Sequence, residues 1–328
     1  MIVVTGGAGF IGSNLVAALD ERGGQEIVVC DHPGRDEKWR NLAKHEVTDV
    51  VAPERLLDFL ERNAGAADAV FHMGAISSTT VTDAELVMRN NFEFSLDLWR
   101  WCAANGVRMI YASSAATYGD GAQGFDDDGS SAALARLHPL NLYGTSKHLF
   151  DCRVARYVEN GAPTPPQWAG LKFFNVYGPN EYHKGPMRSV VVQAWERAAR
   201  GEPVRLFRSH HPDYEDGGQL RDFVSVNDCV AVMLWLYDNP DASGLFNMGT
   251  GTARSFADLA NAVFAALGET PDVAYVDTPE DIRDKYQYFT QAEMAKLRAA
   301  GYEAPFLTLE DGVADYLRNH LSKADPYR

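Results

Sequence analysis

The chain has 328 residues, of which 46% are hydrophobic, so it can bury a substantial core as one large or two medium domains rather than stay disordered. Its formal net charge of −15 would repel phosphate backbones, which argues against a nucleic-acid partner. No apolar run approaches the length of a membrane span, and the opening MIVVTGG reaches glycines too early for a signal peptide. We therefore expect a soluble, cytoplasmic protein without a membrane partner.

Short apolar runs alternate with helical patterns along the first half of the chain. The runs predict strands at 2–4, 27–30, 69–72, 108–112, 171–175 and, later, 245–248. Between the early strands, apolar residues recur every three or four positions, which predicts helices within 13–23, 53–63 and 85–106. The strands are β-branched or aromatic and nearly unbroken, as in parallel strands buried on both faces. The alternation favours an α/β fold with a doubly wound parallel sheet of the Rossmann type.

The second half is less regular. Helical patterns return at 189–200, 226–239, 255–267, 290–300 and 308–321, and polar or glycine- and proline-rich stretches predict loops at 121–135, 160–168 and 208–222. We expect a dinucleotide-binding domain over residues 1–178, which residues 223–251 rejoin. A smaller, mostly helical and discontinuous substrate domain would occupy the rest of 179–328.

A glycine-rich turn follows the first predicted strand. The stretch VTGGAGFIGSN places Gly6, Gly9 and Gly12 three residues apart, between a strand and a helix. Such glycines allow a tight turn, close approach of a pyrophosphate and close packing of helix on strand, while the helix N-terminus directs free N–H groups at the phosphates. Asp31 ends the second strand 19 residues after Gly12, where a ribose-binding carboxylate belongs. The pattern predicts a dinucleotide site.

The choice between NAD and NADP stays open. Asp31 alone favours NAD, because a carboxylate repels a 2′-phosphate. Arg35 and Lys38 follow it at once, and either could reach such a phosphate.

The candidate chemistry lies in two further stretches. Ser113 and Ser114 follow the fourth predicted strand, whose carboxyl end points into the ligand crevice of such sheets. In HPLNLYGTSK, Tyr143 and Lys147 are one helical turn apart and share a face. A nearby ammonium and an oxidised nicotinamide would lower the pKa of the phenol, so that Tyr143 could remove a hydroxyl proton. Such a pair alone would be an ordinary solvated face; the glycine turn and the serines favour an acid–base centre.

Taken together, these residues resemble the extended short-chain dehydrogenase/reductase superfamily, and more specifically the family of ADP-L-glycero-D-manno-heptose 6-epimerases. The similar words are TGGAGFIGSN, SSTT (77–80), ASSAATYG, FNVYGPNEYHKG (174–185) and FTQAEMAKLRAAGY (289–302), and the last two are the more specific. The resemblance implies oxidation of the C6 hydroxyl of an ADP-heptose to a ketone with tightly held NADP. The ketone then turns over, and the hydride returns to its opposite face. Two bases are implied, Tyr143 and Lys184.

The resemblance also implies a set of binding residues in a homo-oligomeric enzyme. Besides Tyr143, Lys147, Ser114 and Lys184 as catalytic groups, the cofactor would be held by Gly6, Gly9, Phe10, Ile11, Gly12, Asp31, His32, Lys38, Met73, Gly74, Ala75, Ile76, Ser77, Asn90, Lys147 and Val176. The ADP-sugar would be held by Ser114, Asn175, Lys184, Gln193, Phe207, Arg221 and Tyr286. Arg221 suits a diphosphate because its planar fork can bind two oxygens, although an ion pair with Asp222 would also account for it.

Several positions depart from the family pattern. Pro186 replaces the usual serine, and Gln193 replaces a histidine or similar residue. A second lysine that helps to hold the 2′-phosphate in the family falls near Pro53 of this chain, which weakens NADP relative to NAD. The loop 209–219 is longer than expected; its histidines and acidic residues fit no metal motif, so no metal is predicted. The four cysteines are Cys30, Cys102, Cys152 and Cys229, and they form no CxxC pair. We expect them to be buried free thiols.

Four alternative functions are compared with this expectation. Another nucleotide-sugar epimerase, such as a hexose 4-epimerase, would use the same scaffold, and a simple dehydrogenase would release reduced cofactor. A 4,6-dehydratase needs an acid and a base beside the serine, where SSAATYG offers only alanines. A non-catalytic, cofactor-sensing protein would be expected to lack the tyrosine, the lysine or the serine.

Overall fold

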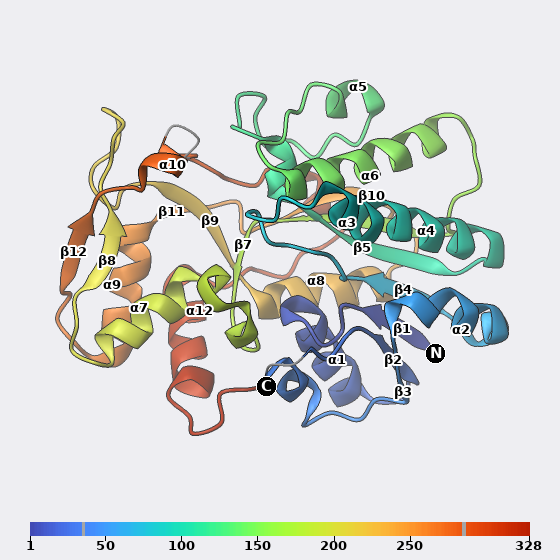
Figure 1. Ribbon diagram of the computed structural model, residues 1–328, viewed down its shortest axis with the longest axis horizontal. Helices are drawn as coiled ribbons and strands as arrows, with labels where there is room; N and C mark the ends of the chain where they lie inside the picture. The colour runs from blue at the N-terminus through green and yellow to red at the C-terminus, as the bar shows by residue number, and fades with distance from the viewer. Residues whose placement is uncertain (35–36, 284–286) are drawn as a thin grey trace.

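A seven-stranded parallel sheet forms the centre of the computed structural model, which describes residues 1–34, 37–283 and 287–328 (Figure 1). The strand order is β10-β6-β5-β4-β1-β2-β3, and every neighbouring pair is parallel. The strands are β1 Ile2–Thr5, β2 Ile27–Cys30, β3 Asp49–Val51, β4 Ala69–His72, β5 Arg108–Ser114, β6 Trp168–Phe173 and β10 Gly244–Met248. The predicted α/β fold with a Rossmann-type sheet is confirmed.

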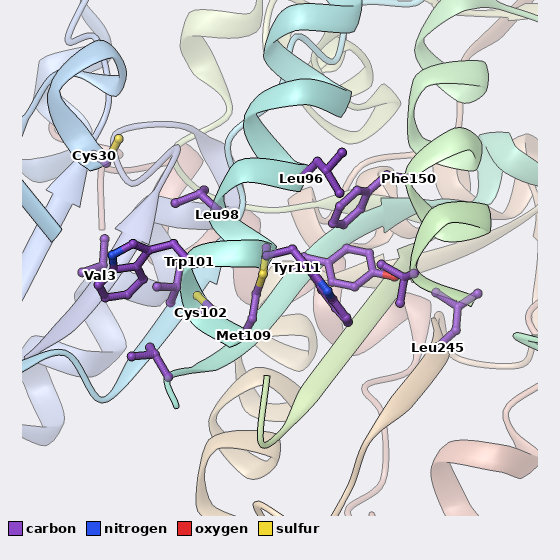
Figure 2. Packing of buried hydrophobic residues seen from close by; sticks show 14 of the residues in the cluster. Val3, Cys30, Leu96, Leu98, Trp101, Cys102, Met109, Tyr111, Phe150 and Leu245 are labelled. Carbon is purple, nitrogen blue, oxygen red and sulfur yellow. The ribbon is translucent and has the colours of Figure 1, made fainter. Parts of the chain in front are cut away.

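Helices cover both faces of this sheet. Consecutive strand residues point to opposite faces, so Val3 packs into the core on one side and Val4 into the core on the other. In Figure 1, α4 and α6 lie on one face and α1 and α8 on the other. Figure 2 shows part of the first core, where Phe150 of α6 lies against Tyr111 of β5 with ring centroids 4.9 Å apart. The helices of the sheet layers are α1 Phe10–Arg22, α2 Leu56–Arg62, α3 Ala84–Met88, α4 Phe94–Asn105, α5 Ser131–Leu134, α6 Leu142–Glu159 and α8 Val226–Asp238.

A second group of elements lies at the side of the sheet (Figure 1). It has its own apolar core, formed by residues of three helices and of the short strands beside them. Its elements are α7 Val190–Ala198, α9 Phe256–Leu267, α10 Glu280–Arg283, α12 Leu309–Tyr316, β8 Val204–Phe207 and β12 Val273–Val276. Helix α11, Ala295–Ala299, instead packs beside β10, and its Leu297 belongs to a core of the central sheet. A three-stranded sheet, in the order β11-β9-β7, adds β7 Asn175–Tyr177, β9 Leu220–Ser225 and β11 Ala253–Ser255.

Four predicted elements need correction. The loop expected over 121–135 contains the short helix α5. The strand expected over 171–175 ends at Phe173, and the chain then enters β7 in a different sheet. The loop expected over 208–222 contains the start of β9, whose Arg221 and Asp222 are buried charged residues that hide the strand pattern. The helix expected over 290–300 is limited to α11, because the backbone N–H of Ala292 donates to the Asp222 carboxylate at 3.0 Å instead of continuing a helix.

The predicted thiols are free, with Cys152 half-buried and the other three buried. Among the described residues, no helix is both long and apolar enough to cross a bilayer. The same residues contain no cluster of three or more histidine, cysteine or acidic side chains placed to hold a metal ion.

Candidate active site

A cavity of about 530 Å³ opens at the carboxyl ends of the parallel strands. The strand order reverses between β1 and β4, and residues that follow both strands line the cavity. Ligands of doubly wound sheets bind in the crevice at such a switch point. The volume also falls in the range that holds cofactors and small substrates.

The glycine turn leaves no room for side chains. Gly6 has φ of +65°, and a Cβ there would lie 2.6 Å from the Cα of Gly74. A Cβ on Gly12 would lie 2.2 Å from the carbonyl oxygen of Gly6, so helix α1 can pack against the turn only without one. Gly9 caps α1 and offers no side-chain acceptor to the first N–H groups of the helix. These groups are therefore available to an anion such as a pyrophosphate.

Asp31 joins the glycine turn to the end of β2. Its Oδ2 accepts from the backbone N–H of Ala8 at 3.0 Å, and its Oδ1 accepts from the Lys38 ammonium at 2.6 Å. The backbone N–H of His32 also donates to Oδ1 at 2.7 Å. A carboxylate suited to a ribose hydroxyl and a cation suited to a phosphate thus lie side by side. Arg35, the other cation considered for this role, lies outside the described residues.

Ser114, Tyr143 and Lys147 line the same cavity. Ser114 ends β5, and the other two lie on the first turns of α6, which Asn141 caps by accepting from the N–H of Gly144 at 2.8 Å. The Ser114 side chain lies close enough to the Tyr143 phenol to influence its pKa as a hydrogen-bonding partner. Sequence reasoning therefore grouped side chains that the fold brings together.

The protonation of this pair depends mainly on burial. Burial raises the pKa of Tyr143, and the hydrogen bond from Ser114 opposes that rise. Burial also lowers the pKa of Lys147 to about 8, while the Asp151 carboxylate acts in the opposite direction. The protein alone thus shifts the pKa of the phenol upward, whereas the lowering expected from the sequence also relies on an oxidised nicotinamide.

Lys184 approaches the cavity from a different element, the turn Tyr182–Met187. Its ammonium lies 5.1 Å from the centroid of the Phe10 ring at the start of α1. Burial lowers its pKa, and the buried Glu181 carboxylate opposes that shift. A half-buried amine with a lowered pKa is a suitable group for proton exchange with a substrate.

Comparison with known proteins supports this geometry. The pattern of the NAD dependent epimerase/dehydratase family matches residues 2–249. The chain belongs to the NAD dependent epimerase/dehydratase family.

Individual relatives of this epimerase/dehydratase chain are similar over nearly its whole length. An ADP-L-glycero-D-manno-heptose-6-epimerase of Nitratidesulfovibrio vulgaris strain DP4 is 51% identical over 329 residues, covering 100% of both chains. The solved ADP-L-glycero-D-manno-heptose-6-epimerase of Helicobacter pylori is 31% identical with a TM-score of 0.77, covering 96% of this chain and 94% of that one. The UDP-glucose 4-epimerase of Thermus thermophilus, solved with NAD, is 27% identical with a TM-score of 0.72, covering 95% and 96%.

All the residues predicted to bind the cofactor in this family member line the cavity. They come from the glycine turn and the start of α1, the end of β2, the turn Glu37–Leu42, the segment after β4, the turn Arg89–Glu93, α6 and β7. The residues are Gly6, Gly9, Phe10, Ile11, Gly12, Asp31, His32, Lys38, Met73, Gly74, Ala75, Ile76, Ser77, Asn90, Lys147 and Val176. Asn90 lies in a π-helical turn, Arg89–Glu93, between α3 and α4, where its side chain donates to the carbonyl of Leu86 at 2.8 Å.

The predicted substrate residues are more dispersed. Ser114 and Lys184 line the first cavity, whereas Gln193 and Phe207 line a second cavity of about 340 Å³ between α7 and β8. Among the described lining residues, neither cavity includes the exposed Asn175 or the buried Arg221. The Arg221 guanidinium donates to the carbonyls of Leu220 and Gln287. Tyr286 lies outside the described residues.

Asn91 holds the site from behind, although no sequence pattern pointed to it. Asn91 donates to the carbonyl of Ile76 and to the hydroxyl of Ser146, both at 3.0 Å, and accepts from the N–H of Ile76 at 2.8 Å. It therefore ties the cofactor segment after β4 to helix α6. The position next to Asn90 was the only signal, since a buried asparagine inside a helix has no pattern of its own.

Proposed function

We propose that this enzyme inverts C6 of the heptose in ADP-D-glycero-D-manno-heptose and so forms ADP-L-glycero-D-manno-heptose for lipopolysaccharide-type glycans. Its family and its relatives make it an epimerase. The observation that carries the proposal is the convergence of two groups that can move a proton, Tyr143 and Lys184, from different elements onto one cavity. Inversion through a ketone needs a proton carrier for each of two substrate orientations.

Each of four side chains in the cavity has its own role in proton transfer. Tyr143 takes the proton of the C6 hydroxyl in one orientation, and Ser114 holds that hydroxyl through a hydrogen bond. Lys147 favours the phenolate through its charge. Lys184 donates or accepts the proton when the ketone has turned over and presents its other face. A bound nicotinamide cofactor supplies the reversible removal of hydride from C6.

We propose NADP as this cofactor, with NAD as the alternative. The glycine turn and the start of α1 provide the pyrophosphate cradle, and Lys38 beside Asp31 provides a cation for a 2′-phosphate. The cofactor would be regenerated in each turnover and retained, because neither substrate nor product carries away the hydride. Denaturing the purified enzyme and identifying the released nucleotide distinguishes the two.

The remaining assignments extend the same proposal. The second cavity, with Gln193 and Phe207, would take the nucleotide end of the substrate, and Asn175, Arg221 and Tyr286 would complete its binding. Residues 1–178 with 223–251 would form the cofactor domain and the rest of 179–328 the substrate domain. We further propose that the enzyme works in the cytoplasm as a homo-oligomer.

The direct test is the substitution Tyr143→Phe. The purified enzyme is incubated with ADP-D-glycero-D-manno-heptose without added cofactor, and the change at C6 is followed by proton NMR. We expect turnover by the parent and a loss of about 10²–10⁴-fold in the variant, as for removal of an acid–base group, with cofactor still bound. Unchanged turnover in the variant would contradict the assignment.

The same assay separates the rival activity. A hexose 4-epimerase is the second candidate, because the solved UDP-glucose 4-epimerase of Thermus thermophilus shares this fold and the 209–219 loop adjoins Phe207 of the second cavity. UDP-glucose therefore serves as the parallel substrate. Epimerisation of UDP-glucose alone would replace the heptose proposal, and accumulation of free reduced cofactor would indicate a dehydrogenase.

A further inference from the structure

A buried ion pair lies behind the candidate active site. The Lys172 ammonium of β6 is 2.9 Å from Oδ2 of Asp151 on α6, and both side chains are 0% exposed. Asp151 follows Lys147 by one helical turn and Tyr143 by two, so its carboxylate lies on the helix face that carries the proposed acid–base pair. The ion pair itself is too deeply buried to contact a substrate.

Hydrogen bonds connect this pair to Ser114 along two routes. The Ser113 hydroxyl donates to Asp151 at 2.6 Å, which fixes the end of β5 against α6. The Lys172 ammonium donates to the Thr117 hydroxyl at 2.6 Å, and that hydroxyl donates to the carbonyl of Ser114 at 2.7 Å. The end of β5, β6 and α6 therefore meet at one carboxylate and one ammonium.

We infer that Asp151 and Lys172 are positioning residues that hold Ser114 in register with Tyr143. The inference rests on the proposed function, since it concerns how that acid–base centre is aligned. A shift of about 1 Å between reacting groups can cost on the order of 10²-fold in rate. The network fixes the end of β5 relative to α6. It therefore fixes the distance between Ser114 on the strand and Tyr143 on the helix, which such a shift would change.

Stability alone gives a poor account of the pair. Two charges lose their hydration when they are buried, and apolar residues of similar volume are often as stabilising or more so. Asp151 also accepts from the Tyr111 hydroxyl at 3.2 Å, so the carboxylate has three donors from two strands. Three donors on one carboxylate fix the relative positions of β5, β6 and α6. This effect on geometry is larger than their contribution to the stability of the fold.

The pair also shapes the charge around the acid–base centre. The Asp151 carboxylate raises the pKa of both Tyr143 and Lys147, although burial is the larger cause for each. The titratable and charged groups facing it from β5 and the turn after it, from β6 and from α6 are Tyr111, Tyr118, Lys172, Tyr143, Lys147, His148 and Cys152. Removal of this negative charge therefore lowers the pKa of the phenol.

The test substitutes Asp151→Asn and measures kcat, KM and the pH profile of epimerisation. We expect kcat to fall about 10²-fold with KM unchanged and cofactor retained. Because kcat rises as the base loses its proton, its midpoint moves to lower pH when the pKa of Tyr143 falls. The matched control is Asp68→Asn, which removes a carboxylate paired with Arg108 at the opposite end of β5 and should leave rate and profile unchanged.

A second variant covers the case in which an unpaired buried Lys172 prevents folding. The double substitution Asp151→Leu with Lys172→Met removes both charges, and we expect it to fold and retain cofactor while kcat falls at least about tenfold. Parental rate and pH profile in the double variant would overturn the inference. If Tyr143→Phe leaves turnover intact, the proposed function itself fails; if Tyr143→Phe abolishes turnover and the double variant does not lower it, only the positioning role fails.

Discussion

Lys38 sets the charge next to Asp31, at the ribose end of the cofactor site. Its ammonium lies 2.6 Å from Asp31 and 3.1 Å from the carbonyl of His32, and only 19% of its side chain is exposed. Without this cation, the carboxylate would repel a 2′-phosphate. With it, the local charge is balanced, and the cation can turn to a phosphate.

We therefore predict that Lys38→Ala lowers NADP affinity more than NAD affinity. Loss of a hydrogen bond to a charged group costs about 1.5–3 kcal/mol, or on the order of 10–100-fold. Titration of cofactor-free enzyme with each nucleotide measures the difference. Lys44→Ala, which removes a cation paired with Asp325 instead, is the control. Equal losses for both nucleotides would contradict a phosphate contact.

Helix α1 can pack against the glycine turn only because Gly12 has no Cβ atom. The helix is buried along nine of its residues, so it cannot move away from the sheet without disrupting the core. The carbonyl of Gly6 lies where a Cβ of Gly12 would be. The contact between Gly6 and Gly12 therefore fixes the glycine turn, helix α1 and the phosphate cradle relative to one another.

Gly12→Ala is predicted to remove bound cofactor while the sheet remains folded. The added methyl group would meet backbone atoms 2.2 Å away, which forces the turn and the helix apart and displaces the N–H groups that face the pyrophosphate. Absorbance of the nicotinamide in the purified variant and its circular dichroism are the measurements. Gly65→Ala, where a Cβ would meet nothing within 4 Å, should retain cofactor. A fully loaded Gly12→Ala enzyme would contradict the cradle.

At the scale of the whole molecule, a buried neutral histidine couples folding to pH. His72 ends β4 between the hydroxyls of Thr5 and Ser95, at 2.6 and 2.8 Å, and is 1% exposed. Burial lowers its pKa to about 3, with the charge of Lys147 as the second cause. The unfolded chain binds a proton near pH 6.5, and the folded chain does not. Stability from this group is therefore present above pH 6.5 and is lost as pH falls toward about 3.

We predict that His72→Gln flattens this part of the stability profile. One proton bound only by the unfolded state gives a slope of about 1.4 kcal/mol per pH unit, which the variant should lose between pH 6 and 4. Denaturant unfolding of both proteins across that range measures the difference, and comparison with the parent cancels the other titrating groups. Parallel profiles would show that His72 is protonated in the folded state.

Six strands of the central sheet, the glycine turn and the group of Ser114, Tyr143 and Lys147 are predictable from sequence, because periodicity, glycine spacing and one helical turn are local properties of the chain. Strand β3 was missed, because it has three residues and two of them are exposed. The tertiary packing makes residues 220–225 a strand, because partners distant in sequence bury Arg221 and Asp222 there. It also decided which pKa values shift and which way, and it joined Asp151 to Lys172. Burial and long-range pairing arise from the packing of separate segments, and no local pattern contains them.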